Sequence, residues 1–135
     1  MDQQTGLYLV NIDIACEGIV GGPVASLNLM VNAPQGLVYG SGTLGHAGTA
    51  PGSEGYAIRN ITGNIHHTGF GTDKLLVQLR GNYSIPFGPT MPGQTEATFT
   101  AALALNQSWE GEGMFTYGPS GHDTCPRARV SRHEK

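Results

Sequence analysis

The chain has little charge and no long apolar segment. Charged residues make up 13% of its 135 residues, which is about half the usual share. No apolar run approaches the ~20 residues that a membrane-spanning helix needs. The N-terminal segment, residues 1–6, lacks both the basic and the apolar region of a secretory signal. We therefore expect no membrane partner, and a location either in the cytoplasm or reached by export outside the Sec route.

Helical periodicity is also missing. Apolar and polar residues instead alternate with period two, most clearly between Leu75 and Phe87, and successive side chains of a strand point to opposite faces. Glycine, with 21 residues, has roughly twice its usual share and separates the alternating segments. Gly40, Gly42 and Gly45 interrupt one such segment, as is typical of a bend or bulge. The sequence therefore predicts an all-β protein whose strands have one buried and one exposed face.

Eight alternating segments can be delimited. They span residues 7–16, 24–32, 37–46, 56–67, 75–87, 95–105, 112–117 and 125–130. Hairpin-length loops and the absence of a long crossover favour a single domain, residues 1–135, folded as an antiparallel up-and-down barrel of about eight strands. A closed barrel also removes the sheet edges that such weakly charged strands would leave exposed. The alternative is a small β-sandwich.

Basic residues are concentrated at one end of the chain. The net charge is −3, yet four of the seven basic residues lie in the last nine positions, a basic C-terminal tail of residues 127–135. Such a tail can contact nucleic acid or an acidic lipid surface, but a solvated terminus is the simpler interpretation. Because no basic stripe interleaved with aromatic residues occurs elsewhere, we expect no nucleic-acid partner. The low overall charge favours a homo-oligomer, a dimer or tetramer that buries part of the outer surface.

The two cysteines test the barrel topology. Cys16 and Cys125 are 109 positions apart, but in an eight-stranded up-and-down barrel the end of the first strand lies beside the start of the last. We predict that their Cα atoms lie within roughly 8 Å, near the ~7 Å limit for bridging. Without an export signal we expect buried free thiols. The alternative is that the two cysteines are unrelated small core residues.

The residues able to carry catalysis or bind a metal do not form a recognised motif. His66 and His67 are adjacent, so they point to opposite faces of their strand, and no Glu-x-x-His or Cys-x-x-Cys spacing occurs. Cys125 lies near His122 but is followed by Pro126, which has no N–H to act as an oxyanion donor. We therefore expect no metal site, no cofactor and no catalytic residue, and the sequence favours a protein that is not an enzyme.

Aromatic residues near the loops are the best candidates for ligand binding. Trp109, Phe70, Tyr56 and Tyr117 lie near expected strand ends, beside Gly- and Pro-rich loops. Aromatic rings on the loops of a rigid barrel commonly bind sugar-like or apolar molecules, although each ring can instead cap the core. The sequence thus favours a non-catalytic binding or assembly module with a small-molecule or glycan ligand.

Two other functions stay open. One is an enzyme with its active site in the barrel mouth, for which Arg59, Arg80, His66 and Asp13 are the candidate polar groups. The other is a structural subunit of a larger homo-oligomeric assembly. A polar residue on the inward face of the barrel would favour the enzyme.

Three segments carry a family resemblance. Residues 6–11 (GLYLVN), 27–34 (LNLMVNAP) and 61–66 (ITGNIH) resemble an uncharacterised bacterial family called domain of unknown function 1842. The similarity spans most of the chain and consists of strand-and-turn patterns. Since the family has no known catalytic residues, the resemblance implies no particular activity or ligand.

Overall fold

The computed structural model describes residues 6–18, 22–46, 56–67, 75–86, 92–118 and 123–132. Eight strands account for most of them. Their bounds are β1 Leu7–Cys16, β2 Pro23–Asn32, β3 Leu37–His46, β4 Tyr56–His67, β5 Leu75–Pro86, β6 Gln94–Leu105, β7 Gly111–Tyr117 and β8 Asp123–Arg132. Within these described ranges, no helix is long and apolar enough to cross a membrane.

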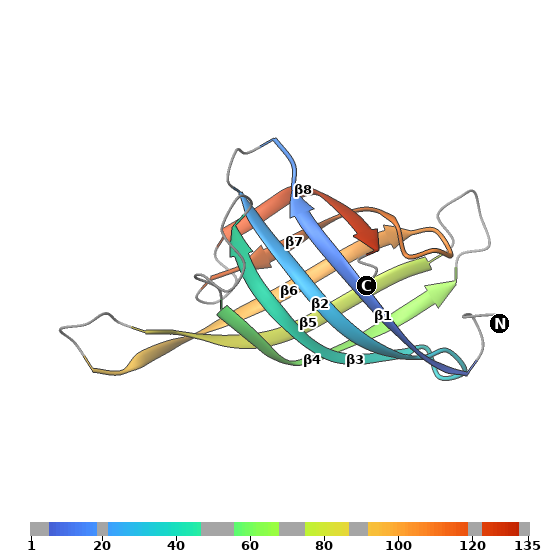
Figure 1. The fold of residues 1–135 in the computed structure, drawn as a ribbon, viewed down its shortest axis with the longest axis horizontal. Coiled ribbons are helices and arrows are strands. Elements are labelled where there is room, and N and C mark those ends of the chain that lie inside the picture. The colour runs from blue at the N-terminus through green and yellow to red at the C-terminus, as the bar shows by residue number, and fades with distance from the viewer. Residues whose placement is uncertain are drawn as a thin grey trace.

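The sheet closes on itself. Each strand pairs antiparallel with the next, and β8 pairs antiparallel with β1, which gives the barrel seen in Figure 1. The closing contact, here called the seam, has five register pairs, from Ile12 opposite Arg132 to Cys16 opposite Ala128. By comparison, β1 and β2 are paired over nine. The expected eight-stranded barrel is confirmed, and the sandwich alternative is wrong.

The last strand extends further than the alternation predicts. β8 continues to Arg132, with Ala128 and Val130 buried inside the barrel and Arg129 exposed outside it. Residues 127–132 of the expected basic tail therefore belong to β8, and residues 133–135 lie outside the described part of the chain.

The barrel interior is a packed apolar core. In β5, the buried side chains are Leu75, Val77, Leu79 and Tyr83, and the buried Gly81 lies between them, so these are the alternate positions that the sequence pattern assigns to one face. Among the described residues, the phenol of Tyr83 and the indole of Trp109 are the side chains with a nitrogen or oxygen in this core, and every buried side-chain nitrogen or oxygen has a hydrogen-bond partner. An eight-stranded barrel is just narrow enough for side chains to fill it.

A bulge in β4 interrupts the alternation. The register of β4 shifts by one residue against both β3 and β5 at Arg59–Asn60, where Asn60 has a left-handed φ of 56°, a conformation that Asn tolerates better than most residues. Ile58 and Ile61 consequently both point inward, although they are three residues apart. Both pack on Gly81, since a Cβ added there would lie 2.8 Å from each isoleucine side chain.

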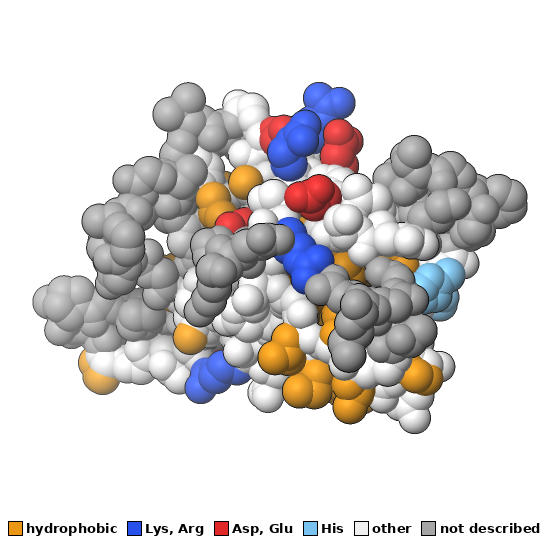
Figure 2. Space-filling model, turned by 45° about the vertical axis from the view of Figure 1, so that its right-hand side comes forward, with side chains coloured by type: hydrophobic (Ala, Val, Ile, Leu, Met, Phe, Trp, Pro, Cys, Tyr) orange, Lys and Arg blue, Asp and Glu red, His pale blue; other side chains and the backbone are white. Residues whose placement is uncertain are grey.

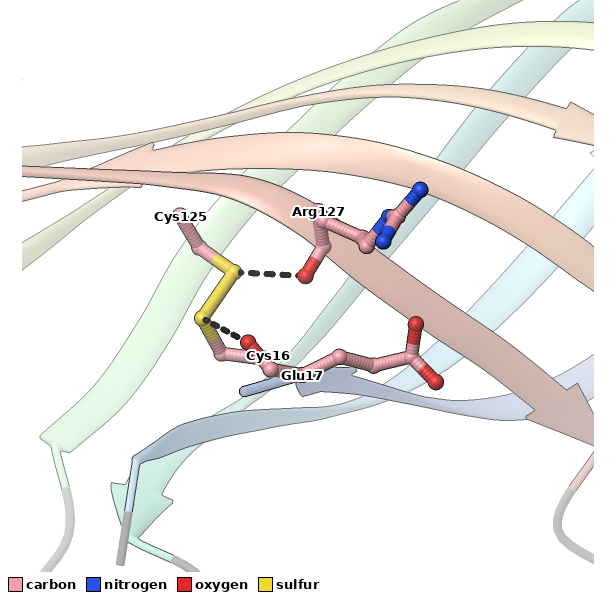
Figure 3. Close-up of a disulfide and its surroundings, with 4 residues drawn as sticks. All are labelled: Cys16, Glu17, Cys125 and Arg127. Atoms are coloured by element: carbon pink, nitrogen blue, oxygen red, sulfur yellow. Dashed lines mark hydrogen bonds between the residues drawn. A yellow bond between two sulfur atoms is a disulfide. The ribbon is translucent and has the colours of Figure 1, made fainter. Parts of the chain in front are cut away.

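The cysteines form a disulfide across the seam (Figure 3). Their Cα atoms are 5.8 Å apart, so the predicted proximity is confirmed. The expectation of free thiols is wrong, because adjacent inward positions on β1 and β8 bring the two sulfurs within bonding distance. The expectation of free thiols rests on the compartment and not on geometry.

Two further contacts flank the disulfide. The Glu17 N–H donates to the Arg127 carbonyl oxygen over 2.9 Å, and the exposed Arg129 Nε donates to Glu17 Oε2 over 3.1 Å. In addition, Cys125 Sγ lies 3.2 Å from the Arg127 carbonyl oxygen, a contact that Figure 3 marks with a dashed line. A disulfide sulfur carries no proton, so this contact becomes an S–H···O hydrogen bond only in the reduced protein.

The outer surface is mostly neutral. In the view of Figure 2, apolar side chains gather along the lower edge, whereas most charged side chains lie higher up. Thr, Asn, Ser and Gln occupy many of the outward positions of the strands, for example Asn28, Ser41, Thr62 and Gln78. These neutral polar residues explain how a chain with so little charge keeps a hydrated outer surface.

Candidate functional site

Trp109 closes one end of the barrel. Its side chain is fully buried, and its indole Nε1–H donates to the Tyr8 hydroxyl over 3.1 Å. The turn between β6 and β7 holds it there, because the side-chain oxygen of Asn106 accepts the backbone N–H groups of Ser108 and Glu110. Trp109 is thus a cap of the core, the alternative that the sequence left open, and it has no surface free for a ligand.

The opposite end of the barrel, here called the mouth, contains a small cavity. Its volume is about 160 Å³, and its walls come from the ends of six strands, which converge there through the antiparallel order. The lining residues are Pro23, Leu44, Tyr56, Tyr83, Ile85, Tyr117, Gly118 and Asp123. Tyr56 is the first residue of β4, Tyr117 is the last residue of β7, and Tyr83 lies near the end of β5, so the topology brings three distant parts of the sequence together.

Aromatic rings pack closely in the mouth. The ring centroids of Tyr56 and Tyr83 are 5.4 Å apart at an interplanar angle of 34°, and Tyr117 packs on Phe115 with centroids 5.7 Å apart. Such tilted pairs lie in the favourable range for aromatic contacts. Tyr83 sits opposite Ala97 of β6, whose small side chain leaves space for the ring.

The polar groups of the mouth are arranged around Gly118. Its N–H donates to the Tyr83 hydroxyl oxygen over 2.7 Å. Its φ of 88° is left-handed, and a Cβ added to it would lie 2.7 Å from Asp123 Oδ2. The carboxylate of Asp123 therefore packs against the backbone that holds Tyr83, while the rest of its side chain faces solvent.

Tyr83 is held in its neutral form. Burial raises the pKa of its phenol above the ordinary value of 10.0, although the hydrogen bond from Gly118 acts in the opposite direction. Tyr56, Asp123 and Tyr117 add smaller effects that raise the pKa of Tyr83 further. At neutral pH this group is a structural hydroxyl and not a base.

The raised pKa predicts a loss of stability in alkali. The unfolded chain releases the Tyr83 proton near pH 10, before the folded chain does, so this contribution to stability is complete below about pH 10 and is lost as the pH rises through the folded pKa. We expect Tyr83→Phe to reduce that alkaline loss. At pH 7 it should lower the free energy of unfolding by about 1–3 kcal/mol, because the Gly118 N–H loses its acceptor.

Urea unfolding at pH 7 and at about pH 10.5 measures both effects. Tyr39→Phe, which changes an exposed phenol on β3, is the matched control and should leave both values near those of the wild type. If Tyr83→Phe and the wild type lost the same stability in alkali, other titrating groups would be the cause of that loss.

Two of the four predicted ligand-binding residues meet in the mouth. Tyr56 and Tyr117 line the cavity, Trp109 closes the other end, and Phe70 lies outside the described residues. The sequence analysis does not select Tyr83 or Asp123 as a site residue. Tyr83 reads as an ordinary inward residue of its strand, and only its position at the strand end signals that it borders the mouth.

The polar residues considered for an enzyme lie elsewhere. Arg80 and Asp13 point outward from the barrel wall, and Arg59 and His66 are exposed on β4. Arg59 donates to the Ser84 hydroxyl, which in turn donates to Glu96. The structure does not bring these four residues together in the mouth. Within the described part of the chain, no three His, Cys, Asp or Glu side chains are grouped so that they could hold a metal ion.

These features define an all-β protein built as a closed antiparallel barrel, capped by Trp109 at one end and hollowed at the other. Residues 5–122 match the family described as Domain of unknown function (DUF1842). The chain therefore belongs to this family, as the three resembling segments predicted. No protein with a curated description matches the chain.

Proposed function

We propose that this protein is a non-catalytic binding module whose mouth takes a compact organic cation, such as a quaternary ammonium group. The supporting observation is the composition of the cavity, which combines three tyrosine rings with one carboxylate and has no Lys or Arg among its lining residues. Tyrosine faces attract cations, and aromatic cages of this kind recognise choline and methylated lysine. The carboxylate of Asp123 adds to the same preference and disfavours anions.

The size of the cavity limits the ligand. Pockets for drug-sized molecules usually measure about 300–1,000 Å³, whereas this one has about 160 Å³. A headgroup or a small free molecule fits that space better than an oligosaccharide. A complete glycan, the other ligand class that the sequence left open, would extend beyond the described walls of the cavity.

A binding role is favoured over catalysis by the state of the polar groups. Acid–base catalysis needs a group whose pKa lies near the working pH, and burial moves the pKa of Tyr83 away from neutrality. Asp123 is the one carboxylate among the lining residues, so the described walls contain no pair of carboxylates that could share such work. The tyrosines of the mouth are better suited to a rigid contact surface for a ligand than to acid–base catalysis.

The disulfide supports a proposal about location. Disulfides persist in oxidising compartments and are rare in the cytosol. The bond between Cys16 and Cys125 therefore favours the second location expected from the sequence, outside the cytoplasm.

Titration with choline, followed by heteronuclear NMR, tests the proposed ligand class. We expect shifts of the Tyr117, Gly118 and Asp123 amides with Kd in the range of about 1 mM, which corresponds to about −4 kcal/mol. The matched probe is 3,3-dimethylbutan-1-ol, which has the shape of choline without its charge and should bind about tenfold more weakly, a difference of about 1.4 kcal/mol.

Two variants separate the contribution of the Asp123 charge to binding from that of the Tyr117 ring. Asp123→Asn should weaken binding of choline but not of the neutral alcohol, and Tyr117→Ala should weaken both. Leu76→Ala, which truncates an exposed leucine of the outer wall on β5, is the control. Equal affinity for the two probes would contradict a cation site, and the absence of shifts at the mouth with either probe would contradict the binding role.

A further inference from the structure

An apolar row crosses the outer wall of the barrel on three neighbouring strands. Leu9 of β1 is paired with Met30 of β2, and Met30 is paired with Tyr39 of β3. Leu7 is the next outward residue of β1. The relative exposures are 67% for Leu7, 69% for Leu9, 47% for Met30 and 48% for Tyr39, so the row is open to solvent in the isolated chain.

The wall around this row carries almost no charge. Neither β2 nor β3 contains an Asp, Glu, Lys or Arg, and in β1 the one such residue is Asp13. All other charged residues within the eight strands lie on β4–β8: Arg59, Arg80, Glu96, Glu112, Asp123, Arg127, Arg129 and Arg132. Apolar side chains gather along the lower edge of Figure 2, at the level where Figure 1 places the start of β1 and the turn between β2 and β3. We call the outward side of β1–β3 the neutral face.

The apolar row supplies about half of the area that each partner of a stable dimer buries. An aromatic side chain offers about 150–250 Å², and if Leu and Met are taken near the lower end of that range, the four exposed fractions leave roughly 400 Å² of largely apolar surface. A stable interface buries about 800 Å² on each partner. Uncharged outward residues around the row, among them Asn11, Asn28 and Ser41, extend the face towards this value and supply a polar rim.

We propose that the neutral face binds a second copy of this chain about a two-fold axis. In such a dimer each residue near the axis faces the same residue of the partner, so a charge there would meet its own sign. The one charged residue of the neutral face, Asp13, lies four positions along β1 from Leu9, so the surroundings of the row avoid that repulsion, whereas a partner of different sequence could pair a charge with one of opposite sign. Interface cores are also enriched in Tyr and Met and depleted of charged residues, as this face is. The inference does not depend on the mouth or its ligand.

Sedimentation and light scattering of the full chain between about 5 and 200 µM test the dimer, since a standard interface with micromolar Kd would be populated there. We expect a mass of twice the chain mass of 14.2 kDa. Leu9→Arg, and separately Met30→Arg, should give a monomer, because each places a charge and its copy near one another in the interface. The matched control is Leu76→Arg on β5, an exposed leucine outside the neutral face, which should leave the dimer intact.

A measurement on the wild type keeps the test decisive if an arginine variant does not fold. A soluble paramagnetic agent should broaden the methyl signal of Met114, which is exposed on β7, and spare that of Met30. A wild type that is monomeric at the highest concentration overturns the proposal. An oligomer that survives both arginine substitutions, or a Met30 methyl as accessible as that of Met114, overturns it equally.

Discussion

Trp109→Ala is expected to lower the free energy of unfolding by about 3–5 kcal/mol, the usual cost of truncating a buried large aromatic residue. The side chain is fully buried and closes one end of the core, so its removal opens a cavity that the barrel walls cannot collapse to fill. The Tyr8 hydroxyl also loses the indole N–H that now donates to it. Urea unfolding at neutral pH measures the effect.

The backbone conformation of Trp109 also indicates that surrounding contacts hold this residue in the core. Its φ of 64° is left-handed, a conformation that costs a residue other than glycine about 1–3 kcal/mol and persists only when surrounding contacts enforce it. Tyr56→Ala, which removes a partly exposed aromatic ring at the mouth, should cost clearly less and serves as the control. If Trp109→Ala were no more destabilising than Tyr56→Ala, the ring would not be part of the core.

Removing the disulfide is expected to cost about 2–5 kcal/mol. The two cysteines are 109 positions apart in sequence, so the bond restricts the unfolded chain over most of its length, and the chain-entropy estimate for a loop of that size is about 4.7 kcal/mol. We expect Cys16→Ala/Cys125→Ala to unfold at a lower urea concentration than the oxidised wild type and at nearly the same concentration as the reduced wild type.

Urea unfolding of both proteins at increasing reductant concentration contains its own control. Because the double variant has no cysteine left, reductant should not move its unfolding midpoint. Mass spectrometry after alkylation reports whether the wild-type thiols are free at each reductant concentration. A fully reduced wild type with an unchanged midpoint would show that the seam is stable without the bond.

The alternation of the strands was sufficient to predict the barrel. Leu79, for example, is an apolar residue between the polar Gln78 and Arg80 and is buried, and this alternation recurs over eight segments with short connections. The proximity of Cys16 and Cys125 then follows from closure alone, since β8 has no free neighbour except β1.

Features that depend on register could not be predicted in this way. Ile58 and Ile61 break the period of two, and only the bulge at Asn60 shows that both point inward. Tyr83 and Asp123 are 40 positions apart and meet because β5, β7 and β8 end at the same level of the barrel. No sequence signal distinguishes a buried Trp109 from an exposed one, because the direction of its ring depends on the left-handed backbone conformation of Trp109 itself in the turn between β6 and β7.

The seam disulfide also determines where the barrel can begin to open. A closed sheet normally frays where its shortest pairing lies, and here that pairing is the five-residue contact of β1 with β8. With Cys16 bonded to Cys125, local fluctuations cannot separate β1 from β8 at the position of the disulfide. Fraying is then left to the far ends of β5 and β6, which pair with each other beyond the last contacts of β4 and β7 and project from the barrel in Figure 1. These ends carry Tyr83 and Ile85, so we expect the fastest amide hydrogen exchange of the described strands in the part of the wall that borders the mouth.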